Sequence, residues 1–248
     1  MSGSGNFEDE IDAMIARELD AAMGRPTDRV RQNSNTQRRT NGNEASGEKY
    51  DLSKNAFVLV LHHYEYNSGK VRMGSKVDME KIKGFFDLYR TEPNGGLEVH
   101  DNLTLRQVRQ LMDTVSQKDF SHCSCLIVII MSHGDQDDTI LAQDDKHYSL
   151  HEDVLEKVAI NVTLANKPKL FIVNACRGSA VVTDAVTFRF DNSDMVIFQS
   201  TYEGHVSYRS TVSGSFFLQE FFDLLRENDH LNICELSTML NSRAVERR

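Results

Sequence analysis

Two apolar segments, each ending in a short polar turn, limit the fold of this chain more than any other feature. Residues 126–131 (LIVIIM) run through one serine into His133, and residues 169–173 (KLFIV) run through Asn-Ala into Cys176. Strands without polar alternation suit a parallel sheet that is covered on both faces. In such sheets the reactive groups gather at the carboxyl ends of the strands. We therefore expect His133 and Cys176 to meet there as base and nucleophile.

Strand and helix patterns alternate along the folded part of the chain, which begins near Tyr50. Thr104 followed by Gln107 is a capping box that predicts the start of one helix. Alternation of this kind predicts an α/β fold, with a mostly parallel central sheet and helices on both faces. The expected strands are 56–61, 97–100, 126–131, 169–173 and 195–198, and the expected helices are 77–89, 105–115, 150–158, 216–225 and 233–243.

Charge and composition exclude several classes of function. The net charge of −9 argues against nucleic acid as a partner. No run of 18 apolar residues could cross a membrane, and residues 1–12 lack the cationic start and apolar core of a secretory signal. Neither the cysteines nor the histidines show metal-ligand spacing, so we expect no metal and no cofactor. We expect no disulfide framework, and reduced cysteine thiols are typical of cytoplasmic proteins.

The first 48 residues differ from the rest of the chain. Apolar residues recur at helical spacing over residues 7–23, and acidic residues in the first turns suit the helix dipole. Residues 25–48 are almost without apolar side chains, so we expect them to be disordered. One helix is too little for a six-helix adaptor domain. Segment 1–48 is either a short prodomain or docking peptide, or a tolerated flexible tail.

Cys176 and His133 each have a structural alternative. A free thiol is only a few per cent thiolate at neutral pH, so a nucleophilic cysteine needs a partner. An imidazole can hold the thiolate and later protonate the leaving amine. Without such a partner Cys176 would be a buried structural thiol and His133 an ordinary turn histidine.

At these residues the chain resembles the caspase family of cysteine proteases. Residues 174–178 read NACRG, where the family signature is QACRG with a histidine about 50 residues upstream. Residues 207–209 read SYR, where the family usually has Trp before the Arg, and GSFF follows at 214–217. The resemblance runs from about Asn55 to about Leu240. It implies a three-layer caspase-like sandwich and a zymogen of a cysteine endopeptidase that cleaves after Asp, in apoptosis or related regulated proteolysis.

The resemblance also assigns roles to individual residues. Cys176 is the nucleophile, His133 is the general acid and base, and the backbone N–H groups of Gly134 and Cys176 form the oxyanion hole. Planar guanidinium groups suit a substrate carboxylate, so two arginines and an amide form the specificity pocket. The implied substrate-binding residues are Arg72, Asn174, Val206, Ser207, Tyr208 and Arg209.

Four of these residues would act on the substrate outside the Asp pocket, and one of the four, Arg209, also within it. Val206 and Tyr208 would line the pocket for the neighbouring substrate residue. Ser207 and Arg209 would pair with the backbone of an extended substrate, as in strand addition. The alternative for this loop is ordinary packing.

The chain departs from the family pattern at several points. Asn174 is one methylene shorter than Gln, so we expect a retained preference for Asp with reduced efficiency, which Asn174→Gln would raise. Lys76 stands where the family has Asp, so a local salt bridge that stiffens the loop of Arg72 is expected to be absent. The chain ends just after its last helix, so the family's final edge strand is expected to be missing.

By this resemblance residues 49–184 correspond to a large subunit, 185–194 to a short connector and 195–248 to a small subunit. Zymogens of the family are cut after Asp, and Asp184 and Asp191 are the candidates for processing here. Because the connector is short, processing is expected to be inefficient or absent.

A second interpretation stays open. A weakly active or non-catalytic homologue that binds and regulates a full-length caspase would be consistent with Asn174, the short connector and the missing strand. The presence of Cys176, His133, Arg72 and Arg209 favours the enzyme, because a regulator has no need of that set. The expected partners are protein substrates and a second caspase chain, in a homodimer or a heterodimer.

Overall fold

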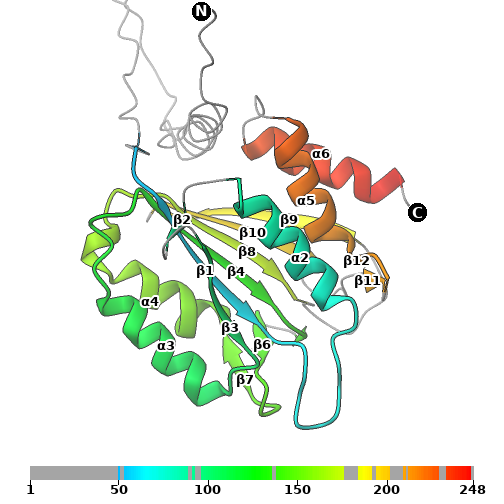
Figure 1. Cartoon of the computed structure of the whole chain (residues 1–248), viewed down its shortest axis with the longest axis horizontal. Coiled ribbons are helices and arrows are strands. Elements are labelled where there is room, and N and C mark those ends of the chain that lie inside the picture. The colour runs from blue at the N-terminus through cyan, green and yellow to red at the C-terminus, as the bar shows by residue number, and fades with distance from the viewer. Residues whose placement is uncertain are drawn as a thin grey trace, which may run out of the picture.

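The apolar segments of the chain form one seven-stranded central sheet (Figure 1). Its order is β2-β1-β4-β8-β10-β9, and β3 also pairs with β1. All pairs are parallel except β9 with β10, which is antiparallel. The strands are β1 (Ala56–His62), β2 (Thr91–Glu92), β3 (Glu98–Asp101), β4 (Cys125–Met131), β8 (Lys169–Asn174), β9 (Asp184–Asp191) and β10 (Met195–Thr201).

This computed structural model describes residues 50, 53–88, 91–92, 96–135, 138–175, 184–191, 194–201, 209–210, 212–228 and 233–246. The helix predicted over residues 7–23 and the polar segment 25–48 lie outside that part of the chain. The helices are α2 (Ser75–Phe86), α3 (Leu105–Gln117), the π-helical turn η1 (Leu150–Leu155), α4 (Glu156–Ala159), the 3₁₀ turn η2 (Val162–Leu164), α5 (Phe216–Glu227) and α6 (Ile233–Glu246).

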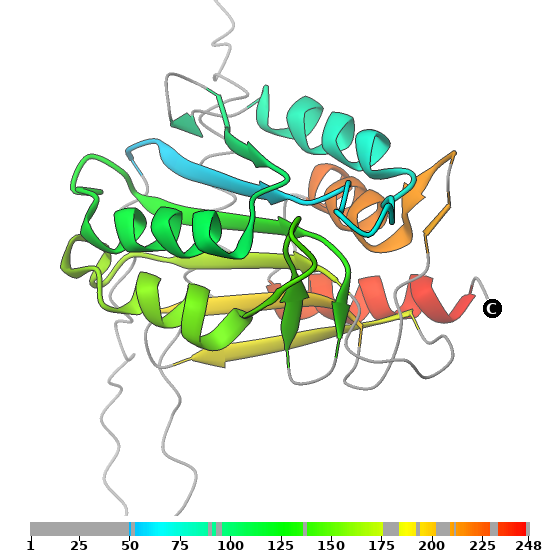
Figure 2. The same cartoon turned by 90° about the horizontal axis from the view of Figure 1, so that it is seen from below.

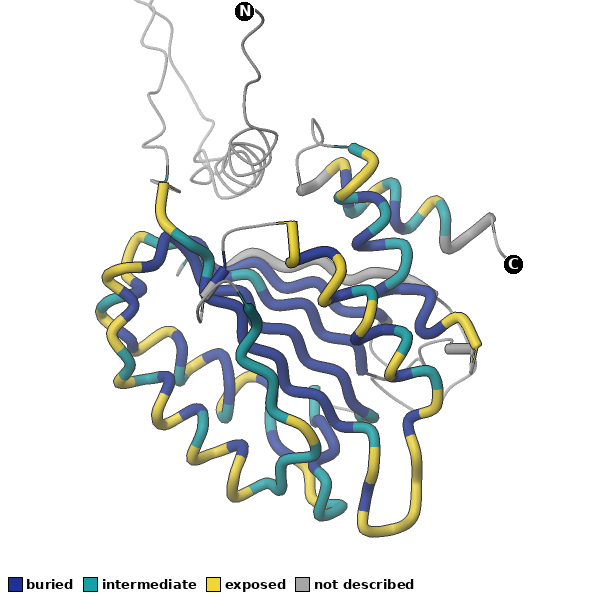
Figure 3. The backbone as a smooth tube through the Cα atoms, viewed as in Figure 1, coloured by how far each residue is buried: buried dark blue, intermediate teal, exposed yellow. Residues whose placement is uncertain are grey.

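Each face of the sheet has its own apolar core, because side chains alternate along a strand. In β1, Val58 and Val60 pack toward α2, α5 and α6, whereas Phe57, Leu59 and Leu61 pack toward α3, η1 and α4. Figure 2 shows the two helical layers on opposite sides of the sheet. The central strands are buried along their lengths, and the exposed positions lie on the outer faces of the helices and in loops such as residues 67–71 (Figure 3). The expected mostly parallel sheet with helices on both faces is confirmed.

The predicted capping box at the start of α3 is confirmed. Gln107 N–H donates to Thr104 Oγ1 at 3.4 Å, and Thr104 N–H donates to Gln107 Oε1 at 2.9 Å. The two bonds satisfy donors that the first turn of a helix leaves without partners. Val108, Met112 and Val115 then face the sheet and are buried.

Two small sheets extend from the carboxyl ends of the central strands. The first contains β5 (Gly134–Asp135), β6 (Thr139–Leu141) and β7 (His147–Ser149), and the second is the hairpin of β11 (Arg209–Ser210) and β12 (Gly214–Ser215). Both carry residues that the sequence assigns to the site.

Residues 185–194 were expected to connect the two subunits as a short loop. Most of them belong to β9, which pairs antiparallel with β10 and contacts α6. This strand forms the edge of the sheet beyond β10. It comes before α5 and α6 in the chain, so the expectation that the family's final strand after the last helix is missing stays a prediction. The processing candidates Asp184 and Asp191 are the first and last residues of β9.

Candidate active site

The register between β4 and β8 determines where the site lies. Met131 at the end of β4 pairs with Asn174 at the end of β8. Ser132 N–H then donates to the carbonyl oxygen of Asn174 at 3.2 Å, so the two chains are still side by side beyond the strands. His133 follows Met131 by two residues, as Cys176 follows Asn174. Cys176 itself lies outside the described residues.

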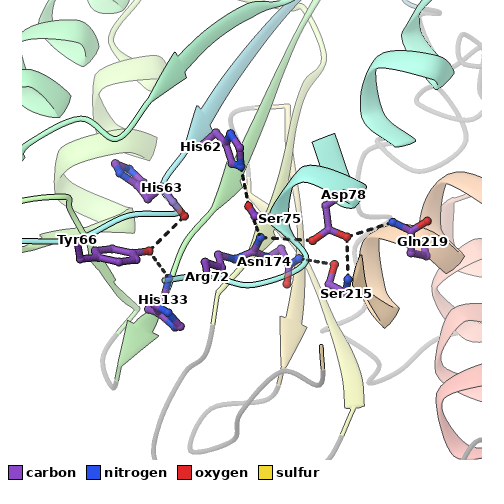
Figure 4. A network of polar contacts seen from close by, with 10 residues as sticks. All are labelled: His62, His63, Tyr66, Arg72, Ser75, Asp78, His133, Asn174, Ser215 and Gln219. Carbon is purple, nitrogen blue, oxygen red and sulfur yellow. Dashed lines mark hydrogen bonds and ion pairs between the residues drawn. The ribbon is translucent and has the colours of Figure 1, made fainter. Parts of the chain in front are cut away.

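Tyr66 contacts both the main chain and the ring of His133. His133 N–H donates to the Tyr66 hydroxyl oxygen at 3.1 Å, and the two rings lie 5.2 Å apart between centroids. The same hydroxyl lies 3.0 Å from Ser132 Oγ and 3.2 Å from the carbonyl oxygen of His63. Since Ser132 Oγ donates to Leu141 O at 2.6 Å, the main chain around His133 is held on both sides. Figure 4 shows the contacts of Tyr66 with His133 and His63.

His63 lies behind Tyr66 and is fully buried. Its Nε2 is 3.2 Å from the Tyr148 hydroxyl, and its Nδ1 has no hydrogen-bond partner among the described residues. Burial lowers the pKa of His63 to about 4, and the nearby His62 and Arg72 act in the same direction. His63 is therefore a neutral structural side chain beneath the site.

Arg72 lies in the loop that connects β1 to α2, and its side chain is buried. Its N–H donates to the carbonyl oxygen of Tyr64 at 2.8 Å. Gly74, with φ of 77°, lets the chain turn from this loop into α2, a conformation that side chains with a Cβ rarely adopt. Nη1 of Arg72 donates to Ser75 Oγ at 2.9 Å and pairs with Asp78 Oδ2 at 3.4 Å.

The contact with Asp78 corrects one sequence-based expectation. Lys76 was expected to leave the loop of Arg72 without a salt bridge, but Asp78, two residues further along α2, provides one. Asp78 and Arg72 are both buried, so each charge offsets the cost of removing the other from water.

His62 extends the same network from the end of β1. Its Nε2 is 2.6 Å from Ser75 Oγ, and its Nδ1 is 2.8 Å from Asp101 Oδ1. Arg72 can only donate, so Ser75 accepts from Arg72 and gives its own proton to Nε2 of His62. The Nδ1–H of His62 then donates to Asp101. Burial lowers the pKa of His62, in keeping with this neutral tautomer, although Asp101 opposes the shift.

Asn174 is buried at the end of β8, and its amide nitrogen donates to Ser215 Oγ at 2.6 Å. Ser215 belongs to β12, where it pairs directly with Arg209 of β11. The structure thus brings Asn174 close to the hairpin that carries Arg209. The side chain of Arg209 lies outside the described part, as do Val206, Ser207 and Tyr208. Their predicted roles stay predictions.

Several residues of this site cannot be found from the sequence pattern. Tyr66 and Asp78 stand in no motif that we recognised, and each acts through contacts between distant segments. The signal closest to Asp78 is its place in the first turns of a helix that follows Arg72-Met73-Gly74. Ser215 lies in the GSFF motif, which contributes to the resemblance but assigns this serine no role.

Within the described ranges, His, Cys, Asp and Glu side chains form no group of three or more that could hold a metal ion. None of the helices that the structure describes has the length and apolar character needed to span a bilayer.

Comparison with known proteins matches residues 55–247 to the Caspase domain. Caspase-1 of Spodoptera frugiperda is 28% identical over 189 residues, which are 69% of this chain and 60% of that protein, so less than two thirds of its length is matched. Caspase-6 of Mus musculus is 27% identical over 230 residues, or 81% of this chain and 80% of its own length. The crystal structure of caspase-1 from Spodoptera frugiperda superposes with a TM-score of 0.62 at 24% identity, covering 77% of this chain and 79% of that one.

Proposed function

Since the chain belongs to the caspase family, we propose that it is a cysteine endopeptidase that cleaves after Asp, with Cys176 as nucleophile and His133 as general acid and base. We assign it to apoptosis or related regulated proteolysis in the cytoplasm, starting as a zymogen.

One observation carries this proposal, namely the pairing of Met131 with Asn174 across β4 and β8. His133 and Cys176 each follow their strand by two residues in the sequence, so we expect both to lie at the same edge of the sheet. Tyr66 holds the main chain of His133 there. A thiol and an imidazole at such an edge form the nucleophile and base of a protease.

The proposed chemistry uses two steps. The thiolate of Cys176 forms a bond to the backbone carbonyl carbon of the substrate Asp, and the C–N bond breaks as protonated His133 gives its proton to the leaving amine. Water then attacks this carbon while His133 takes a proton from the water, and the C–S bond breaks, which releases the acid and restores the thiolate and the protonated His133. Backbone N–H groups of Gly134 and Cys176 stabilise the oxyanion in both steps, and loss of one such donor typically costs about 10²–10³-fold in rate.

Arg72, Asn174 and Arg209 bind the substrate carboxylate in this proposal. The two described side chains, Arg72 and Asn174, belong to one network, in which Arg72 pairs with Asp78, Asp78 bonds to Ser215, and Ser215 bonds to Asn174 (Figure 4). Guanidinium groups give a carboxylate both charge and planar geometry, so a substrate amide such as Asn would bind less well.

A second function is favoured by one specific observation. Arg72 and Asn174 are each only 1% exposed, so the described part of the pocket is closed to a ligand. A regulator that binds a full-length caspase would need no open pocket, whereas an enzyme must expose these groups when it binds substrate. The partner in that case is another caspase chain, in place of protein substrates.

Hydrolysis of a fluorogenic tetrapeptide ending in Asp tests the proposal. The purified chain, with its fold checked by circular dichroism, is compared with Cys176→Ala and with a peptide ending in Asn. Turnover that needs both Cys176 and Asp supports the enzyme. A folded chain without turnover that changes the rate of an added full-length caspase supports the regulator and overturns the enzyme.

A further inference from the structure

Asp78 is the one described carboxylate that touches both sides of the proposed specificity pocket. It lies in the first turns of α2 and is completely buried. Its Oδ2 pairs with Nη1 of Arg72 at 3.4 Å, and its Oδ1 accepts from the backbone N–H of Ser215 at 2.7 Å. Gln219 of α5 also donates to Oδ1, at 3.1 Å. Residues 72–78 and residues 215–219, which are far apart in the chain, therefore meet at one side chain (Figure 4).

The contact with Ser215 reaches the second arginine of the pocket through the backbone. Ser215 pairs with Arg209 in the β11–β12 hairpin, so the position of Ser215 determines where the backbone of Arg209 lies. Ser215 Oγ also accepts from the Asn174 amide at 2.6 Å. Asp78 thus acts on Arg72 directly, and on Asn174 and Arg209 through Ser215.

Gly214 shows how closely the hairpin approaches this carboxylate. A Cβ on Gly214 would lie 2.4 Å from Asp78 Oδ1, and its φ of 79° is a conformation that glycine favours. Only a glycine lets the backbone N–H of Ser215 come within hydrogen-bond distance of Asp78. The neighbouring residues Gly214 and Ser215 are both buried, so water does not compete for this bond.

We propose that Asp78 is a positioning residue that locks Arg72 and the β11–β12 hairpin in one relative arrangement, and so sets selectivity for Asp over other substrate residues. This inference rests on the proposed function for its substrate, but the structural link between Asp78 and the hairpin does not. Two arginines that must converge on one carboxylate repel each other, and a fixed buried anion offsets that repulsion before substrate arrives.

The test uses two substitutions at Asp78 with different consequences. Asp78→Ala removes both carboxylate oxygens, so Arg72 loses its ion pair and the backbone N–H of Ser215 loses its acceptor. Asp78→Asn keeps an oxygen for Ser215 and Gln219 but places an amide donor against Arg72, where two donors repel each other. The second variant also keeps the proposal open to test if the alanine variant does not fold.

An ion pair between the same two helices, away from the pocket, provides a matched control. Lys81 of α2 and Asp223 of α5 form a partly exposed ion pair, with 19% and 40% of the side chains accessible. Asp223→Ala therefore removes an α2–α5 ion pair that does not touch the pocket, and such exposed pairs contribute little to stability.

The first readout is amide hydrogen exchange at residues 209–215, measured by mass spectrometry. This measurement does not require the chain to be active. Asp78→Ala is expected to speed exchange at Ser215 by about tenfold or more, while Asp78→Asn and Asp223→Ala stay near the unmodified chain. If Asp78→Ala leaves this exchange unchanged, or Asp223→Ala raises it equally, the inference is overturned.

The second readout is steady-state hydrolysis of matched peptides ending in Asp or Glu. Asp78→Asn is expected to raise KM for the Asp peptide about tenfold, to change kcat less than about threefold, and to reduce the preference for Asp over Glu. Unchanged KM and preference would overturn the role in selectivity. If the unmodified chain shows no turnover that depends on Cys176, the proposed function fails, whereas the exchange experiment still decides whether Asp78 fixes the hairpin.

Discussion

Tyr66 contributes to the site through its hydroxyl group, which accepts the backbone N–H of His133. Removing that hydroxyl leaves the ring contact with His133 in place, so the effect of the hydrogen bond can be separated from packing. We expect Tyr66→Phe to lower kcat of the Asp peptide about tenfold, because an unpaired buried N–H costs about 1–3 kcal/mol and shifts His133.

The control for this substitution is Tyr148→Phe. Tyr148 is also buried, but its hydroxyl contacts His63 and not His133. Both variants are measured for kcat and for thermal stability. Equal losses of kcat in the two variants would show that Tyr66 only stabilises the fold.

His63 predicts a pH dependence of stability. Its pKa is about 4 in the folded chain, below the usual 6.5, chiefly because it is buried. Between these two values the unfolded chain binds the proton and the folded chain does not, so stability is lost as the pH falls. We expect the free energy of unfolding to drop by about 2 kcal/mol between pH 7.5 and 5 from this residue alone.

Urea unfolding at pH 7.5 and pH 5 measures this change. His63→Phe should flatten the dependence, whereas His151→Gln, at an exposed position, should leave it as it is. His62 also has a lowered pKa and adds to the loss in the same direction, so some slope is expected to remain. An unchanged slope in His63→Phe would contradict the assignment.

At the residue scale, the sequence pointed to the groups that we propose carry the chemistry, but not to those that position them. His133, Arg72 and Asn174 follow strand ends or motifs that are visible in one dimension. Tyr66 and Asp78 act across 67 and 137 residues of chain, respectively, and no local pattern encodes such contacts. Asn174 was expected to reach the substrate, and its amide donates to Ser215 in this structure, so its effect on efficiency stays a prediction.

At the element scale, α3 offers a direct test of the capping box. Thr104→Ala removes the side-chain acceptor for Gln107 N–H and should lower the free energy of unfolding by about 1 kcal/mol. Thr114 lies in the exposed interior of the same helix, so Thr114→Ala should be neutral or slightly stabilising because Ala is the better helix former. Urea unfolding compares the two, and equal effects would show that the cap contributes nothing.

Strands and helices with strong periodicity were predictable from the sequence, whereas β9 was assigned to a connector. Val186, Phe188 and Phe190 alternate with Thr187 and Arg189, which is the pattern of a half-buried strand. The resemblance assigned the segment to a connector, and local pattern alone does not say which partner a strand will find. The partner is β10, with which β9 pairs antiparallel, so the tertiary context decided the outcome.

At the scale of the whole molecule, the chain on either side of the proposed processing region shares one core. β10 lies between β8 and β9, and pairs with β8 from Met195 to Gln199. The core under α2, α5 and α6 contains Ile172 from before this region and Val196, Phe198 and Phe217 from after it. Separating the two parts would expose this apolar surface to water, which opposes separation.

This arrangement predicts the behaviour of a cut chain. With a site for a sequence-specific protease inserted between Ala180 and Val181, cleavage should leave two fragments that elute together in native size-exclusion chromatography and separate only in denaturant. Asp78 and Asn174 before the cut both bond to Ser215 after it, so the site is shared by the two fragments. Cleaved chain should therefore keep its turnover of the Asp peptide, and fragments that separate in native buffer would contradict this account of the core.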